Sequence, residues 1–433
     1  MTDKATSIDL TSFRGPAMRA FHMAWLAFFV CFFAWFACAP LMPLVKHEFN
    51  LTADQVANIN IAAVAITILV RVLVGPLCDR YGPRKVYVGL LLLGTLPLVG
   101  AALSPSYLPF LLCRLGIGAV GASFVITQYH TSVMFANKVV GAANATSAGF
   151  GNAGAGAAQL LIPVLLAAAI GWGASHAMAW RLVLLVPAAV MPVVAWMYWQ
   201  FTQDCPEGNF SDLRARGVSI ESGKKGGWQS LATAARNYRV WMLFITYGAC
   251  FGVEVFIHNV AAMYYVDHFH ASLGFAGLAA GCFGLLAIVG RPLGGILSDA
   301  LAARRGLSAR AVLLFFLIAG EGAGLLLFSH ASDAGLAFAS MLLFGVFTHM
   351  ACGSTYALVP FVDRKALGGV TGLVGAGGNA GAVAASFLFK GMGDLHQALM
   401  LLAVVVMVCS ICALTVRLRS EPAATDVPLP ATN

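Results

Sequence analysis

Long apolar segments separated by short polar or charged ones run through the whole chain. Each has about 18 residues or more, which is enough to cross the hydrocarbon core of a bilayer as one α-helix. The pattern therefore predicts twelve membrane-spanning helices. Six lie in the first half of the chain, at 21–45, 56–78, 87–104, 107–134, 139–170 and 178–202. Six more follow, at 239–266, 273–298, 311–329, 334–361, 367–392 and 395–416.

The amino-acid composition is also that of an integral membrane protein. Hydrophobic residues make up 60% and charged residues 10%, and the mean hydropathy is +0.83, far outside the range of soluble domains. The 21–45 segment is too long for the apolar core of a secretory signal, so we expect it to be retained as the first helix. The predicted fold class is an all-α polytopic membrane protein.

The distribution of Lys and Arg predicts the orientation. If both termini are cytoplasmic, only Lys46, Arg181 and Lys390 fall in loops on the opposite side. Cationic loops remain on the cytoplasmic side, so we expect a multi-pass protein of the cell inner membrane. The net charge of +8 then reflects topology, and no nucleic-acid partner is expected.

The two halves of the chain repeat in the same order, which makes them parallel repeats of six helices. An offset of 220 relates Arg71, Gly75 and Asp79 to Arg291, Gly295 and Asp299. An offset of 227 relates Lys138 and Gly141 to Lys365 and Gly368, and the run 151–155 (GNAGA) to 378–382. We expect a first half at 1–203, a hydrophilic cytoplasmic linker at 204–238, a second half at 239–418 and a cytoplasmic tail at 419–433.

Arg71 and Arg291 lie inside apolar helices, each eight residues before an aspartate. At 1.5 Å per residue they are about 12 Å from the helix ends, near the middle of the membrane. An arginine there costs about 2.5–3.5 kcal/mol and stays charged. We interpret the pair as a clamp for a small planar anion, which a guanidinium can bind through two parallel hydrogen bonds. The alternative is that each arginine bonds a helix carbonyl or a nearby carboxylate.

Glycine-rich helices at 147–156 (SAGFGNAGAG) and 374–383 (VGAGGNAGAV) each contain one asparagine. Small residues at this spacing let helix backbones approach closely. A buried amide can donate to an anion without adding charge. Most of these glycines are expected to serve helix packing, whereas Asn152 and Asn379 are candidate ligands.

Several motifs resemble the major facilitator superfamily, and more narrowly its nitrate/nitrite porter family. Residues 75–85 (GPLCDRYGPRK) look like the superfamily's cytoplasmic loop motif, and 295–306 hold a degenerate copy. Both glycine-rich signatures of the porter family are present, and 32–45, 204–217 and 247–259 add further similarity. The resemblance covers nearly the whole chain and is closest to the branch of plant high-affinity transporters and bacterial proton-linked importers.

The resemblance implies a major facilitator fold and transport of nitrate or nitrite. Carried over residue by residue, it assigns the anion to Arg71, Arg291, Asn152 and Asn379 with the adjoining Gly151 and Gly378. It assigns the aromatic walls of the pocket to Phe124, Tyr247 and Phe251. The loop motif implies a gate at the helix ends, formed by Asp79, Arg80, Arg84 and Asp299.

Import of an anion against an inside-negative potential needs protons or an exchanged anion, because each charge costs about 2.3 kcal/mol per 100 mV. Glu254, in the middle of the seventh helix and matching a glutamate of the importer branch, is the candidate proton carrier. Its alternative role is a fixed counter-ion of the arginines. Lesser candidates are His258, His130, His349 and Glu321, while Arg114 is expected to be structural or indirectly coupling.

The predicted function is nitrate import by alternating access, with proton symport favoured. A nitrate/nitrite antiporter would keep the arginines without needing a titratable Glu254, and a nitrate-binding sensor is a more distant alternative. No paired carboxylates, metal-spaced histidines or activated serine indicate an enzyme. The ten cysteines are scattered and form no disulfide or zinc pattern. We expect no cofactor and no metal, and a functional monomer.

Overall fold

A computed structural model describes residues 4–218, 227–363, 366–392 and 395–416. The predicted tail 419–433, Lys365 and part of the predicted linker, 219–226, lie outside the described residues. The first helices are α1 (Gly15–Phe36), η1 (Ala39–Leu41), α2 (Met42–Glu48), α3 (Ala53–Tyr81), α4 (Pro83–Ala102), α5 (Tyr107–Gly118), η2 (Ala119–Ala122), α6 (Ser123–Met134), α7 (Val140–Gly171) and α8 (His176–Phe201). The short helices α9 (Phe210–Ala215) and α10 (Gly227–Ala235) follow. Then come α11 (Tyr238–Phe269), α12 (Leu273–Leu285), α13 (Ala287–Arg305), α14 (Ser308–Ser329), α15 (Ala334–Leu358), η3 (Val359–Phe361), α16 (Leu367–Met392) and α17 (Leu395–Leu414).

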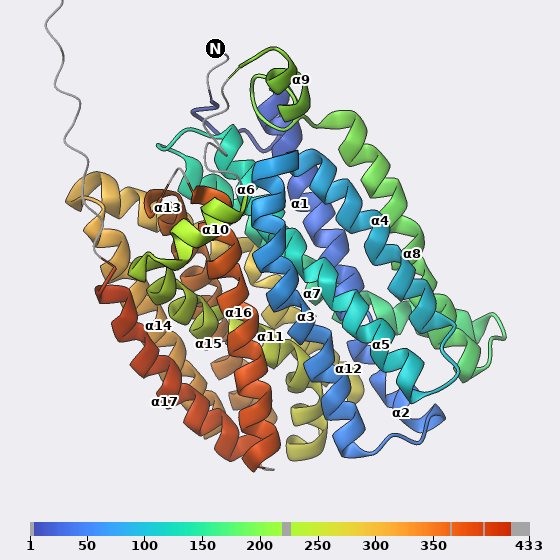
Figure 1. Cartoon of the computed structure of the whole chain (residues 1–433). Coiled ribbons are helices and arrows are strands. Elements are labelled where there is room, and N and C mark those ends of the chain that lie inside the picture. The colour runs from blue at the N-terminus through green and yellow to red at the C-terminus, as the bar shows by residue number, and fades with distance from the viewer. Residues whose placement is uncertain (1–3, 219–226, 364–365, 393–394, 417–433) are drawn as a thin grey trace, which may run out of the picture.

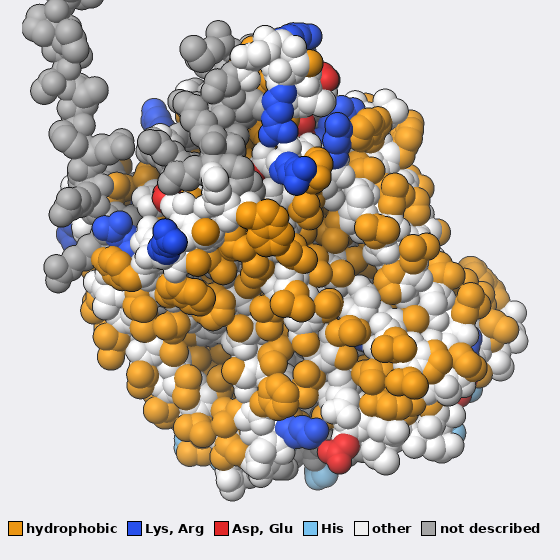
Figure 2. Space-filling view, viewed as in Figure 1, with side chains coloured by type: hydrophobic (Ala, Val, Ile, Leu, Met, Phe, Trp, Pro, Cys, Tyr) orange, Lys and Arg blue, Asp and Glu red, His pale blue; other side chains and the backbone are white. Residues whose placement is uncertain are grey.

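Twelve of the described segments are long and apolar enough to cross a membrane, which confirms the predicted all-α multi-pass fold. They run side by side, and α9 and α10 lie at the same end of the bundle as the N-terminus (Figure 1). We call this the linker end. In Figure 2 orange side chains cover the flank of the bundle, while most of the visible Lys and Arg gather towards the linker end. This is the surface expected of a protein embedded in lipid.

Helix ends follow local sequence signals. The Thr52 side chain accepts from the backbone N–H of Gln55, whose side chain accepts in turn from the Thr52 N–H, a capping box that begins α3. Ser272 caps α12 in the same way with its hydroxyl. On the linker side α3 and α13 end at Gly82 and Gly306, whose φ angles are +88° and +80°. Glycine adopts this backbone conformation without a steric penalty.

Two of the predicted spans are interrupted in the middle. The 107–134 segment changes from α5 to the 3-10 helix η2 and then to α6, and the 273–298 segment breaks at Leu286, between α12 and α13. A change in helix type disturbs the regular i to i−4 ladder and frees backbone carbonyls. Both interruptions supply carbonyl groups to the site described below.

The two predicted halves meet through matching glycine contacts. A Cβ atom on Gly75 of α3 would lie 2.1 Å from the carbonyl oxygen of Gly368 on α16, and one on Gly295 of α13 would lie 2.9 Å from that of Gly141 on α7. These four glycines are the ones that the sequence offsets relate to each other. The repeat seen in sequence therefore corresponds to two equivalent close crossings, α3 with α16 and α13 with α7.

Candidate functional site

Arg71 is fully buried in α3 and joins backbone groups from both parts of the chain. Its Nε and Nη2 atoms donate to the carbonyl oxygen of Gly121 at 3.1 and 2.9 Å. Gly121 belongs to η2, where the α-helical ladder is interrupted. Its Nη1 atom donates to the carbonyl oxygen of Gly375 on α16 at 2.7 Å. Arg71 thus ties the first half to a glycine-rich helix of the second.

Arg291 is equally buried, in α13, but its surroundings differ. Its Nη2 atom donates to Oε2 of Glu254 on α11 at 2.5 Å. Its Nε and Nη1 atoms make no hydrogen bond of normal geometry among the described residues, although the Tyr247 hydroxyl lies nearby. Unsatisfied donors in a buried place are costly. The predicted pair of arginines is therefore asymmetric, and Arg291 holds the unused donors.

Aromatic rings bring the two arginines to one place. The Cζ atom of Arg71 lies 5.2 Å from the ring centre of Phe124 and 4.7 Å from that of Phe251. For Arg291 the corresponding distances are 6.0 and 5.6 Å. Phe124 comes from α6 and Phe251 from α11, and their rings are stacked 6.1 Å apart. Residues 220 positions apart in sequence thus share one cation–π platform between the two predicted halves.

Tyr247 completes this platform, since its ring is nearly parallel to that of Phe251 at 5.1 Å. The structure adds Tyr356 of α15, whose ring contacts Phe124 edge-on at 4.5 Å and Tyr247 at 5.0 Å. Sequence reasoning missed Tyr356 because it lies among other apolar and small residues and outside the repeated motifs. We call Phe124, Tyr247, Phe251 and Tyr356 the aromatic wall.

The signature glycines support the wall by leaving room for it. A Cβ atom on Gly378 would lie 2.5 Å from the ring of Phe251 and 2.8 Å from that of Tyr247, and one on Gly151 would lie 1.9 Å from the ring of Phe28. Of the candidate ligands, Asn152 donates to the carbonyl oxygen of Ala148 at 2.9 Å, leaving its own Oδ1 atom without a partner. Asn379 is fully buried next to Gly378. The glycines therefore shape the site.

Alanine in place of Gly378 should lower nitrate uptake about tenfold. The added methyl group would push Phe251 and Tyr247 towards the arginines, and overpacking of this kind costs about 1–3 kcal/mol. Uptake by membrane vesicles at equal protein level measures the effect. Gly89→Ala in α4 is the matched control, because no other atom lies within 4 Å of the added Cβ. Wild-type uptake by Gly378→Ala would show that these rings do not shape the site.

Of the five candidate proton carriers, Glu254 alone bonds to Arg71 or Arg291 within the described residues. Its Oε2 atom also faces Nδ1 of His349 at 3.5 Å and the thiol of Cys352 at 3.6 Å. The His349 Nε2 atom bonds to the carbonyl oxygen of Phe283 at 2.9 Å. The Glu254 carboxylate therefore lies between the Arg291 guanidinium and the His349 imidazole in the interior of the membrane.

The other candidates of the sequence analysis are placed differently. His258 has no partner for either ring nitrogen in the described residues, and its ring packs against Phe36 and Phe283 at 5.2 and 5.4 Å. Glu321 is fully buried in α14, and neither of its carboxyl oxygens has a hydrogen-bond partner among the residues that the structure describes. His130 is held through both nitrogens, by the Tyr198 hydroxyl and the Gln203 carbonyl. His130 is thus a structural group.

Arg114 does not reach the platform. Its Nη1 atom donates to the backbone carbonyl of Trp35 at 3.0 Å, and both residues belong to the first half. This contact fixes α5 against α1 and fits the structural role considered for Arg114.

At the linker end, the two motif aspartates lie against the helices of the opposite half. Asp79 accepts from the Tyr129 hydroxyl at 3.0 Å, and its Oδ2 atom would be 2.4 Å from a Cβ on Gly368 of α16. Asp299 accepts from the backbone N–H of Ala142 on α7 at 2.8 Å and pairs with Arg310 at 2.6 Å. Each carboxylate thus sits at the first turn of a glycine-rich helix, where the helix dipole favours negative charge.

The two motif arginines lie elsewhere. Arg84 packs on the Trp199 ring at 4.1 Å and donates to the Trp199 carbonyl at 3.0 Å through Nε. Arg80 lies over the ring of its neighbour Tyr81 at 5.1 Å. The loop motif implied that the four residues together form a gate. In the structure Asp79 accepts from Tyr129, Asp299 accepts from the Ala142 amide and pairs with Arg310, and Arg84 lies at the end of α8.

Asp204, within the linker motif 204–217, contacts the loop motif at 75–85. Its buried carboxylate accepts from the backbone N–H groups of Arg84 and Phe210, both at 2.9 Å. It therefore caps α4 and α9 together. Burial raises the pKa of Asp204, and the two backbone hydrogen bonds oppose that rise. A Cβ on Gly82 would lie 2.3 Å from this carboxyl group, so the motif glycine makes room for it.

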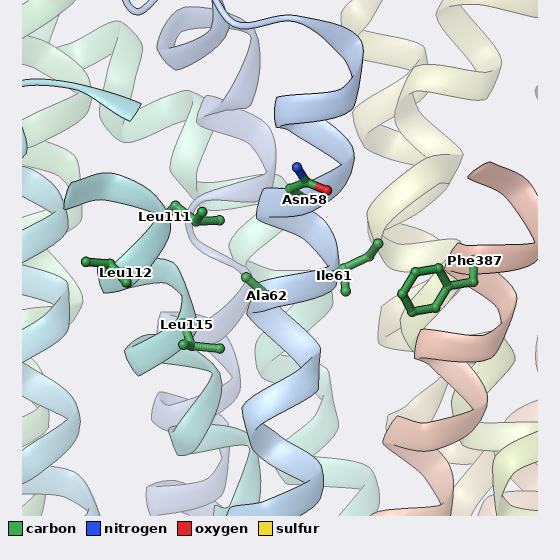
Figure 3. Close-up of a pocket in the computed structure, with 7 residues that line it drawn as sticks. All are labelled: Asn58, Ile61, Ala62, Leu111, Leu112, Leu115 and Phe387. Atoms are coloured by element: carbon green, nitrogen blue, oxygen red, sulfur yellow. The ribbon is translucent and has the colours of Figure 1, made fainter. Parts of the chain in front are cut away.

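An apolar recess of about 300 Å³ lies between α3, α5 and α16 (Figure 3). Its lining is Asn58, Ile61, Ala62, Leu111, Leu112, Leu115 and Phe387. None of these side chains is charged, and Leu112 and Phe387 are exposed on the flank of the bundle. The recess is suited to lipid chains, and neither clamp arginine lines it.

Two parallel sets of six spans around a buried cationic centre define the architecture of a major facilitator. The family model of the Major Facilitator Superfamily matches residues 24–359 and 242–431. A proton:xylose symporter of this fold superposes with a TM-score of 0.68 over 92% of this chain and 94% of that one, at 15% identity. The human organic anion transporter MFSD10 does so with a TM-score of 0.64 over 92% of this chain and 100% of that one, at 14% identity.

Relatives that share sequence with this chain point to a narrower family within the superfamily. The chain is 37% identical to the high affinity nitrate transporter 2.5 of Arabidopsis thaliana, over 89% of this chain and 76% of the relative. It is 39% identical to the high-affinity nitrate transporter 2.3 of Oryza sativa subsp. japonica, over 89% and 74%. A nitrate/nitrite transporter of Nostoc punctiforme is 25% identical over 86% and 87%. The chain belongs to the nitrate/nitrite porter family of the major facilitator superfamily.

Proposed function

We propose that this protein imports nitrate across the inner membrane in symport with protons, and that nitrite can take the place of nitrate. The observation that carries the proposal is the buried pair Arg71 and Arg291 on one aromatic platform, with two nitrogens of Arg291 that bond to no acceptor in the described part of the chain. The oxygens of a small planar anion would satisfy these donors. The nitrate transporters among its relatives support the same substrate.

Binding would couple to protons through Glu254. Nitrate on Arg291 brings a second negative charge to the guanidinium that Glu254 already contacts at 2.5 Å. Two anions at one buried cation repel each other, so nitrate favours a protonated Glu254. Nitrate and one proton then enter together and leave the net charge of the site unchanged. A fully charged Glu254 would instead be a fixed counter-ion, which is the arrangement that an antiporter needs.

Transport would follow from rocking of the two halves about this site. The proposed halves are 1–203 and 239–418, with the linker 204–238 and the tail 419–433 on the cytoplasmic side. Asp79 and Asp299, each at the first turn of a helix from the other half, would hold the linker end closed. Arg80 and Arg84 would act indirectly, through the end of α8. We propose cytoplasmic termini, from the positive-inside distribution, and a functional monomer.

Uptake of labelled nitrate into vesicles that contain only this protein tests the proposal. With an imposed inward proton gradient and no internal nitrite, nitrate should accumulate above the external concentration, and a proton ionophore should abolish the accumulation. Accumulation that depends on internal nitrite would replace symport by exchange. Nitrate binding without any transport would make the protein a sensor.

A further inference from the structure

His349 lies next to Glu254, and its hydrogen bond on the far side of the ring determines which nitrogen faces that carboxylate. It is fully buried in α15, and its Nε2 atom lies 2.9 Å from the carbonyl oxygen of Phe283. A carbonyl oxygen only accepts hydrogen bonds, so Nε2 must carry the proton. Phe283 belongs to the last turn of α12, which ends at Leu285 just before the break at Leu286. Carbonyls of a last helical turn lack intrahelical donors, and this one is bonded by His349.

With its proton on Nε2, a neutral His349 presents a lone pair at Nδ1. That atom faces Oε2 of Glu254 at 3.5 Å and has no hydrogen-bond partner in the described chain. Two acceptors face each other across this distance, and Arg291 holds the same oxygen at 2.5 Å. A proton on Glu254 would turn the contact into an O–H···N hydrogen bond. The imidazole is thus oriented to accept from a protonated Glu254.

The surroundings single out His349 for this role. The titratable and charged groups around it are Glu254, Cys250 and His258 on α11, Arg291 on α13, Cys352 on α15 itself and Glu321 on α14. Helix α7, which also packs against α15, carries no titratable side chain. His258 lies between two phenylalanine rings, and Glu321 bonds to neither arginine in the described residues. Among the residues that the structure describes, only His349 combines a fixed tautomer with an acceptor that faces Glu254.

We propose that His349 is a positioning residue for the transported proton: its Nδ1 atom accepts the hydrogen bond of Glu254 when nitrate occupies Arg291. The proton comes from water on the outer side, binds to Oε2 of Glu254 and remains on that oxygen, while His349 stays neutral. When nitrate leaves on the inner side, Arg291 attracts the carboxylate again and the proton departs to water. This inference rests on the proposed proton coupling through Glu254.

Two substitutions separate the two nitrogens of His349. His349→Gln retains an amide N–H that can reach the Phe283 carbonyl but removes the acceptor at the position of Nδ1. His349→Asn retains an acceptor close to the position of Nδ1 but loses the donor to Phe283. His330→Gln, at the exposed end of α14, is the matched control. Nitrate affinity of the purified protein, measured between pH 5 and 9, is the readout.

In the wild type, nitrate affinity should rise as the pH falls, because nitrate and a proton bind together. In His349→Gln the midpoint of this rise should shift to lower pH by about one unit, a tenfold higher proton concentration, since the protonated carboxyl loses its acceptor. His349→Asn and His330→Gln should keep the wild-type midpoint. Nitrate counterflow, which needs no net proton movement, should persist in all three and shows that they are folded.

Other outcomes would overturn the inference. A normal midpoint in His349→Gln would mean that Nδ1 takes no part, and a shift in His349→Asn alone would mean that the ring only braces Phe283. In either case proton coupling through Glu254 would still stand. A wild type whose nitrate affinity is independent of pH would overturn the proposed coupling as well. Infrared difference spectra on nitrate addition give a check without variants: a protonated, hydrogen-bonded carboxyl band should appear in the wild type, and its absence would refute the inference.

Discussion

Lysine at position 291 should abolish nitrate uptake without preventing folding or membrane insertion. The guanidinium of Arg291 reaches Glu254 with Nη2 and still offers Nε and Nη1 to an anion. A lysine keeps the charge but has only one nitrogen, and that nitrogen would form the ion pair with Glu254. The variant therefore loses two charge-assisted hydrogen bonds to nitrate. At about 1.5–3 kcal/mol each, their loss weakens binding roughly 100-fold or more.

Arg71→Lys should have an equally severe effect for a different reason. Arg71 joins the carbonyls of Gly121 and Gly375 with three nitrogens, and one ammonium group cannot span both while facing the aromatic wall. The variant keeps the positive charge, but it should lose the link between η2 and α16 together with the planar guanidinium that faces a planar anion. Uptake of labelled nitrate and the amount of protein in the membrane are the two measurements.

The control for both variants is Arg181→Lys. Like the two clamp arginines, Arg181 lies over an aromatic ring, at 4.2 Å from the ring centre of Trp180. It pairs with Glu48 at 2.7 Å and belongs to neither clamp motif. A partly exposed ion pair of this type contributes at most about 1 kcal/mol, so this variant should transport normally. Wild-type uptake by both Arg71→Lys and Arg291→Lys would refute the clamp.

The sequence predicted the twelve spans and the meeting of Arg71 and Arg291 because both depend on local pattern and on the repeat. Apolar length determines a span, and the offsets of 220 and 227 place equivalent residues in equivalent positions. Phe124 and Phe251, although assigned only by resemblance, do lie under both guanidinium groups. Where symmetry or length governs the structure, one sequence is enough.

The asymmetry of the site could not be predicted in this way. Glu254 belongs to α11, and α1, the first span of the other half, contains no carboxylate. Arg71 therefore bonds to carbonyls and Arg291 to an acid, which are the two contacts considered as the alternative to anion binding. The carbonyls of Gly121 and Phe283 are available only because η2 and the break at Leu286 interrupt the helices. Such interruptions depend on tertiary packing and leave no clear mark in an apolar sequence.

Replacement of Glu254 by glutamine should separate nitrate binding from proton movement. The amide can still accept a hydrogen bond from Arg291, but it carries no charge and takes up no proton. Nitrate then meets no competing carboxylate on Arg291, so its affinity should be at least as high as in the wild type at neutral pH. Gradient-driven accumulation should be lost, whereas counterflow of labelled nitrate should continue.

Protonation of Glu254 also predicts the direction in which nitrate affinity changes with pH. In the wild type, protonation of Glu254 removes the negative charge that opposes nitrate, so affinity should increase as the pH falls, by up to about tenfold per pH unit for one linked proton. In Glu254→Gln the affinity should be flat over the same range. Titration of the purified protein with nitrate at several pH values measures both slopes.

Glu48→Gln provides the comparison, since it removes a carboxylate that also pairs with an arginine but lies outside the clamp. It should keep the wild-type slope and the gradient-driven accumulation. If Glu254→Gln instead accumulated nitrate normally in exchange for internal nitrite, Glu254 would carry no transported proton and the protein would be an antiporter. The same arginines would serve in both mechanisms, because they bind the anion, and the charge state of Glu254 alone decides what travels with it.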